Sequence, residues 1–206
     1  MENMQSHQPD EESFDENQSI QVIKEMIQIS QKKLKNDGIL FIVWGWVMFL
    51  GYMLMYFDHQ LVMTYSMRLI TKWTGNLLLL AGLIFTVYYI LKQRKRVQTY
   101  IGISLRYVWI SMIFCMMLIN MIQYNVMHQI HFELQLPVFM AVIAFAIVTT
   151  GGILRYRLLT LGGILFGILA YLSSYLTLPY QILTEAFAWL IAFIIPGHMM
   201  YSNRKS

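Results

Sequence analysis

The sequence predicts an all-α fold: a polytopic membrane protein with a six-transmembrane-helix bundle and an N-terminal cytoplasmic amphipathic helix. The first observation is composition, because 57% of the 206 residues are hydrophobic and 13% are charged, about half of the roughly 25% charged residues of soluble domains. The second is a series of uncharged stretches, each close to the roughly 20 residues that a helix needs to cross a bilayer. The third is that the basic residues gather in alternate connections between these stretches.

The uncharged stretches give the boundaries of the expected spans. The last long run, from 158 to 184, exceeds one untilted helix, and Pro179 divides it into two spans joined by a tight hairpin. A single helix kinked at Pro179 is the alternative, and it would leave five spans. We expect a transmembrane domain over 37–201, with spans at about 38–57, 73–91, 103–125, 135–154, 158–176 and 180–200.

The distribution of Lys and Arg predicts the orientation. Outside the six spans, twelve lie on the side of the two termini and two, Arg68 and Lys72, lie on the other side, with Arg106 near the first group. The positive-inside rule therefore predicts a multi-pass membrane protein with both termini, including the tail 202–206, in the cytoplasm. Anionic inner-leaflet lipids are the expected neighbours of the loop residues Lys92, Arg94, Lys95, Arg96, Arg155 and Arg157.

The N-terminal segment divides into two parts. Residues 1–18 are polar and acidic, which predicts a disordered tail. Residues 19–36 show helical periodicity, with one apolar face formed by Ile20, Ile23, Ile27 and Leu34. Such a helix can lie on the inner leaflet, or it can dock into a cytoplasmic protein partner.

One acidic residue falls inside an expected span. Glu185 lies several residues into the sixth span, where a carboxyl group is costly and by default marks function or a polar partner. Asn120 and Gln123 are candidate partners at a similar depth, which predicts a ligand-binding or proton-coupling site near the outer face. The alternative is a carboxylate that reaches the outer headgroups past Pro179.

Metal and cofactor sites have weaker support. His128, His131 and Glu133 form an H-x-x-H-x-E pattern in an outer loop, and on a helix the two histidines would share a face. Three candidate ligands without a clear fourth are also what a solvated loop contains. No cofactor is expected, and no P-loop, H-E-x-x-H, G-x-S-x-G or C-x-x-C motif indicates a catalytic residue.

Glycines mark expected helix contacts. Gly163 and Gly167 form G-x-x-x-G, and Gly45 lies in the first span. Small residues let membrane helices approach closely, within the bundle or in a homo-oligomer. The repeated G-G-I-L at 151–154 and 162–165 surrounds Arg155 and Arg157, where the glycines are expected to permit a sharp cytoplasmic turn and close contact between the two helices.

Three stretches carry a family resemblance: F-I-V-W-G-W at 41–46, L-R-Y-R-L-L-T-L-G-G at 154–163 and I-P-G-H at 195–198. Together they resemble a group of small six-span bacterial inner-membrane proteins that lack an assigned function. The resemblance covers about residues 20–200 and implies a regulatory or accessory role, because members are often encoded beside a winged-helix-type regulator. It supplies no catalytic residues.

These observations favour a non-enzymatic integral inner-membrane protein that acts through protein partners. One alternative is a small transporter or ligand-binding membrane subunit, since six spans in about 200 residues is also the plan of the substrate-binding subunits of vitamin importers. The second alternative is an unrecognised membrane metalloenzyme of the outer loops. Nucleic acid is not expected as a partner, because the basic residues lie between apolar runs where topology accounts for them.

Overall fold

The computed structural model describes the chain except residues 1–15, 36–37, 62–64, 94–99 and 203–206. Throughout the described part the regular elements are helical, which confirms the predicted all-α class. The elements are α1 Glu16–Lys35, α2 Ile39–Gln60, α3 Tyr65–Gln93, α4 Tyr100–Met127, α5 Phe132–Ile153, α6 Arg157–Ser173, α7 Leu178–Trp189, the π-helix η1 Leu190–Ile194 and α8 Ile195–Ser202.

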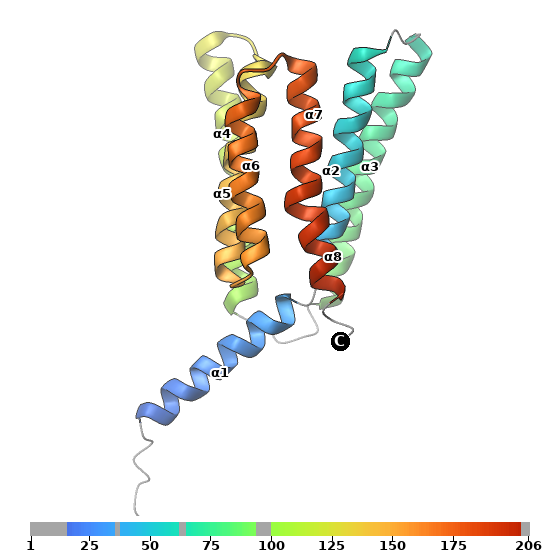
Figure 1. Ribbon diagram of the computed structural model, residues 1–206. Coiled ribbons are helices and arrows are strands. Elements are labelled where there is room, and N and C mark those ends of the chain that lie inside the picture. The colour runs from blue at the N-terminus through green and yellow to red at the C-terminus, as the bar shows by residue number, and fades with distance from the viewer. Residues whose placement is uncertain (1–15, 36–37, 62–64, 94–99, 203–206) are drawn as a thin grey trace, which may run out of the picture.

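Helices α2 to α8 lie side by side in one bundle (Figure 1). The helix formed by α7, η1 and α8 is central and packs against α2, α5 and α6, whereas α3 packs mainly on α2 and α4 mainly on α5. The α5–α6 connection, α1 and the end of α8 lie at one end of the bundle, here called the α1 end. The α4–α5 and α6–α7 connections lie at the opposite end, here called the far end.

The bundle has the apolar outer surface of a membrane protein. Large apolar side chains are exposed along α3 and α4, whereas Glu185, Gln181 and Gln123 are buried. Soluble monomers rarely expose contiguous apolar surface on this scale. Five helices, Ile39–Gln60, Tyr65–Lys92, Ile101–Met127, Phe132–Ile153 and Leu178–Ser202, are long and apolar enough to cross a membrane. The chain is therefore a multi-pass helical membrane protein.

Helix α6 is apolar but shorter than the other five. Its 17 residues span about 25 Å at 1.5 Å per residue, against a hydrocarbon thickness of about 30 Å. It nevertheless runs alongside α5 and α7 over most of their length in Figure 1.

The central helix contains one wide turn. At η1 the Ile195 N–H bonds to the Leu190 carbonyl, five residues back, instead of four. Pro196 follows directly, and a proline ring inside an α-helix clashes with the carbonyl four residues earlier and offers it no N–H. The π-turn relieves this conflict, so the helix continues to Ser202.

Three stretches that lie far apart in the sequence, 41–46, 154–163 and 195–198, meet around this turn. An added Cβ on Gly45 would lie 2.7 Å from Ile194 Cγ1, and one on Gly197 would lie 3.0 Å from the Ile42 nitrogen. On the other side of the central helix, an added Cβ on Gly162 would lie 3.0 Å from the Ala192 Cα. Gly45, Gly162 and Gly197 are thus positions where α2 and α6 approach the central helix closely.

The corner between α5 and α6 corrects one prediction. The expected role of Gly151 and Gly152 in the turn is wrong, because both are helical and the left-handed residue is Arg155, with φ of 50°. The Tyr156 N–H bonds to the Gly151 carbonyl and the Arg155 N–H to the Gly152 carbonyl, the Schellman pattern that usually places glycine where Arg155 stands. The close contact expected between the two helices is confirmed at Gly151, which lets α5 approach Thr160 of α6.

Two boundaries also differ from the expected ones. Helix α1 begins at Glu16, so residues 16–18 of the expected disordered tail are helical, and residues 1–15 lie outside the described chain. Arg68 and Lys72 were expected in a loop but belong to α3. Hydropathy marks only the part of a helix that crosses hydrocarbon, and the first two turns of α3, which contain Arg68 and Lys72, extend beyond it.

Candidate functional site

The carboxyl group of Glu185 is the most deeply buried charged group among the described residues. Its side chain has 0% exposure. The Tyr52 hydroxyl of α2 and the Trp189 indole nitrogen, one turn along α7, both lie close enough to interact with the carboxyl group. Neither contact reaches hydrogen-bond geometry, and both Glu185 oxygens and the Trp189 nitrogen are buried without a partner in the described structure.

Helical spacing explains how these groups come together. Gln181, Glu185 and Trp189 are four residues apart and therefore share one face of α7. All three are buried, because α7 is packed on α2, α5 and α6. The helix begins with Thr177 as its N-cap residue and Pro179 in its first turn, where proline costs no hydrogen bond.

Gln181 is the polar group on the far-end side of Glu185. Its Nε2 donates to the Glu133 carbonyl at 3.1 Å and to the Leu176 carbonyl at 3.0 Å. These bonds tie α7 to the first turn of α5 and to the end of the α6–α7 connection. Its Oε1 is buried without a partner among the described residues.

An aromatic cluster lies on the other side of Glu185, toward the α1 end. Trp189 contacts Phe166 of α6 at 5.6 Å between ring centroids and Phe193 of η1 at 4.5 Å. Phe193 also contacts Phe41 of α2 at 5.5 Å and Trp109 of α4 at 5.8 Å. Four parts of the bundle thus supply one continuous apolar layer. We refer to these five residues as the aromatic cluster.

Asn120 and Gln123 lie at a different helix contact from Glu185. The Asn120 Oδ1 accepts a hydrogen bond from Gln135 Nε2, and Gln123 Nε2 donates to the His131 carbonyl at 3.1 Å. Both bonds tie α4 to α5. The expectation that these two residues are the partners of Glu185 is therefore wrong, since its neighbours are Tyr52 and Trp189.

Sequence reasoning missed both neighbours for different reasons. The sequence could have predicted the contact with Trp189, because this residue follows Glu185 by one helical turn. Tyr52 had none, because its pairing with Glu185 depends on how α2 packs against α7.

The expected metal ligands do not form a site. Helix α4 ends at Met127 and α5 begins at Phe132, so His128 and His131 share no helix face. His128 has a left-handed backbone with φ of 55°, and the His131 ring contacts Gln129 Nε2 at 2.8 Å. Glu133 lies exposed in the first turn of α5. In the described residues, no group of three His, Cys, Asp or Glu side chains can hold a metal ion.

The basic residues expected at lipid headgroups are exposed where the structure describes them. Arg155 and Arg157 are exposed at the α5–α6 corner, and the Lys92 ammonium lies 5.8 Å from the centre of the Tyr88 ring. Arg94, Lys95 and Arg96 lie outside the described residues.

The predicted packing glycines differ in how tightly they are enclosed. A Cβ on Gly163 would lie 2.8 Å from the Val148 backbone nitrogen, whereas one on Gly167 would meet the Ala144 Cβ at 3.5 Å. Gly163 therefore permits close approach of α6 to α5, as Gly45 does for α2 and η1, and Gly167 makes an ordinary contact.

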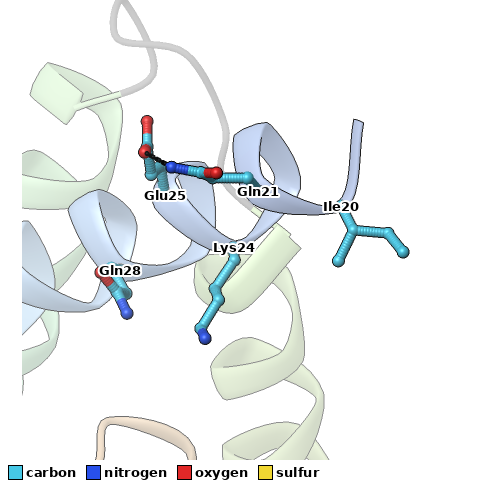
Figure 2. Close-up of a pocket in the computed structure, with 5 residues that line it drawn as sticks. All are labelled: Ile20, Gln21, Lys24, Glu25 and Gln28. Carbon is cyan, nitrogen blue, oxygen red and sulfur yellow. Dashed lines mark hydrogen bonds between the residues drawn. The ribbon is translucent and has the colours of Figure 1, made fainter. Parts of the chain in front are cut away.

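Helix α1 presents apolar side chains that the bundle does not cover. Ile20 and Ile23 are 63% and 58% exposed, and Ile27 is exposed as well; the side chain of Leu34 lies outside the described part. Figure 2 shows a shallow hollow along α1, lined by Ile20, Gln21, Lys24, Glu25 and Gln28, in which Gln21 Nε2 donates to Glu25 Oε1 at 3.4 Å. Its described lining comes from one helix, so it does not enclose a small molecule.

Comparison of the chain with protein-family models, with curated proteins and with solved structures finds no match.

Proposed function

We propose that this chain is a six-pass protein of the bacterial inner membrane that acts through a cytoplasmic protein partner bound at α1. In this topology α6 is the fifth of six crossings, the α1 end is cytoplasmic and the far end is the outer face. The arrangement of α6 beside α5 and α7 (Figure 1) and the exposed Arg155 and Arg157 at the α1 end support it.

The uncovered apolar face of α1 is the observation that carries this proposal. Val22, Met26 and Ile29 are exposed and at 100° per residue they extend the face formed by Ile20, Ile23 and Ile27 to about half of the helix circumference. The opposite side carries Lys24, Glu25 and glutamines. An uncovered apolar face of this kind matches the helix-in-groove mode of binding.

Two matched variants test the role of this face. Ile23→Asp combined with Ile27→Asp places two charges on the apolar face, whereas Gln21→Ala combined with Gln28→Ala alters the polar face of the same helix. The full chain and the polar-face variant are expected to co-purify with the same cytoplasmic protein. The apolar-face variant is expected to insert into the membrane and lose that protein.

Two results would contradict the proposal. One is that the full chain retains no cytoplasmic protein. The other is that the apolar-face variant keeps its partner but an α1 peptide with the same changes loses binding to anionic vesicles, which would assign the face to the inner leaflet.

The buried Glu185 favours a second candidate function, that of a small transporter or ligand-binding membrane subunit with a polar site near the outer face. An intramembrane carboxyl group without a hydrogen-bond partner is costly and is usually retained for function. Loss of a transport or growth phenotype in Glu185→Gln, with normal insertion, would support this candidate, and an unchanged phenotype would count against it.

A further inference from the structure

We propose that Glu185 is a proton-binding site that exchanges its proton with the outer face along α7. This inference rests on the second candidate function and on the proposed topology, and it is independent of the partner at α1. The ligand is the simplest one a lone carboxyl group takes: a proton adds to one carboxylate oxygen on binding and leaves from it on release, with no other reactant.

The environment of the Glu185 carboxyl group favours its neutral, protonated form. Both Glu185 oxygens are buried and lack a hydrogen-bond partner among the described residues. An ionised carboxylate removed from water without a partner costs far more than a neutral carboxyl group in the same place. The closed bundle therefore favours the protonated form, and release of the proton requires the site to be hydrated or rearranged.

Glu185 lies closer to the far end of the central helix than to its α1 end. Glu185 lies seven residues from the start of α7 at Leu178 and seventeen from the end of α8 at Ser202, or about 10 Å and about 25 Å of helix. The next residue on the same face toward the outer end is Gln181, whose buried Oε1 has no partner in the described structure. A water molecule that bridges Gln181 and Glu185 would satisfy both side chains.

In the other direction the aromatic cluster blocks the path. Its rings contact one another at centroid distances of 4.5 to 5.8 Å and come from α2, α4, α6 and the central helix. These contacts exclude water from the inner side of Glu185. Exchange with the outer face is therefore the shorter path and the one that begins at a polar group.

The titratable groups on the helices packed around Glu185 differ in their distance from it along the bundle. Tyr52 is the titratable side chain that interacts with Glu185 from α2. The remaining titratable groups of the packed elements lie toward the ends of the helices: Tyr56, Asp58 and His59 on α2, Glu133 on α5, Arg157 and Tyr171 on α6, and Tyr180 on α7. Glu185 is thus the acid that can hold a proton at this depth, with Tyr52 and Trp189 as its polar neighbours.

Infrared difference spectroscopy of the purified full chain in nanodiscs tests proton binding directly. During a pH titration we expect a carbonyl-stretch band of a protonated carboxyl group, and we expect this band to be lost in Glu185→Gln. Glu133→Gln, which removes an exposed carboxyl group at the far end of the same bundle, is the matched control and is expected to keep the band. Tyr52→Phe is expected to shift the band frequency, which provides a readout if Glu185→Gln does not fold.

A one-sided pH jump tests the direction of exchange. In proteoliposomes of known orientation, the tryptophan fluorescence change that depends on Glu185 is expected to follow a pH jump on the outer face and not one on the inner face. The proposal is overturned if Glu185→Gln removes no part of the titrating band, if the folded protein shows no titrating band, or if the response follows inner pH alone. A sodium-dependent signal at fixed pH would identify a cation site and would also overturn it.

These results are separable from those on α1. Glu185→Gln is expected to leave co-purification of the cytoplasmic partner unchanged, and the apolar-face variant of α1 is expected to leave the carboxyl band unchanged.

Discussion

Replacement of Gly163 by alanine tests the packing of α6 against α5. The added Cβ would lie 2.8 Å from both the nitrogen and the Cγ2 of Val148. The backbone atom cannot move aside without shifting a helix, so α5 and α6 must separate. Overpacking of this kind costs about 1–3 kcal/mol, and the better helix propensity of alanine returns about 1 kcal/mol. We expect a net loss of up to about 2 kcal/mol.

Gly167→Ala on the same helix is the matched control. Its Cβ would meet the Ala144 Cβ at 3.5 Å, an ordinary van der Waals distance. Alanine has a better helix propensity than glycine, and no steric clash offsets that gain at this position. Stability is therefore expected to stay the same or rise by up to about 1 kcal/mol. The sequence motif treats the two glycines as equivalent, and the structure separates them.

Thermal unfolding in detergent, followed by fluorescence-detected size exclusion, measures the difference. At about 2–4 °C per kcal/mol for chains of this size, Gly163→Ala is expected to lower Tm by several degrees and Gly167→Ala to leave it unchanged or raise it slightly. Equal shifts in the two variants, or a larger loss in Gly167→Ala, would refute the close approach of α5 and α6 at Gly163.

Three further predictions concern single contacts. Arg155→Gly is expected to stabilise the fold by about 1 kcal/mol, measured as a rise in Tm, because a left-handed φ strains a side chain and not a glycine; Arg157→Gly, in the first turn of α6, is expected to give no gain. Thr86→Val removes the 2.9 Å bond from Trp44 Nε1 and is expected to lower stability by about 0.5–1.5 kcal/mol, with denaturation in SDS as the assay. Tyr156 lies at the end of the bundle and is 8% exposed. Its burial removes water from the hydroxyl and raises the pKa of that group above the ordinary 10.0. Above about pH 10 the unfolded chain therefore loses this proton first, so stability falls as pH rises, and Tyr156→Phe is expected to reduce the fall.

The sequence predicted the fold where a physical rule acts locally. Uncharged runs of about bilayer length indicate membrane helices because each helix satisfies its own backbone hydrogen bonds, and an acid such as Glu185 stands out within such a run. The α5–α6 corner was predicted at the right place, because Arg155 and Arg157 interrupt the apolar pattern there.

The remaining features depend on contacts between distant segments. The proximity of Tyr52 to Glu185, and the contrast between Gly163 and Gly167, follow from how helices cross, which no local pattern specifies. The π-turn at η1 arises from Pro196 within a continuous helix, and a proline alone does not distinguish that outcome from a kink. His128 and His131 would share a face only on a helix, and the chain turns between α4 and α5 at these residues.

Cysteine labelling of the loops tests the six-pass topology most directly. In a Cys115→Ser background, which removes the single native cysteine, a cysteine is introduced at Gln129, Tyr175 or Arg155, all of which are exposed. With a membrane-impermeant thiol reagent, Gln129→Cys and Tyr175→Cys are expected to label in intact cells, and Arg155→Cys only after lysis. Labelling of Tyr175→Cys and Arg155→Cys from the same side would show that α6 does not cross the membrane and would contradict the six-pass account.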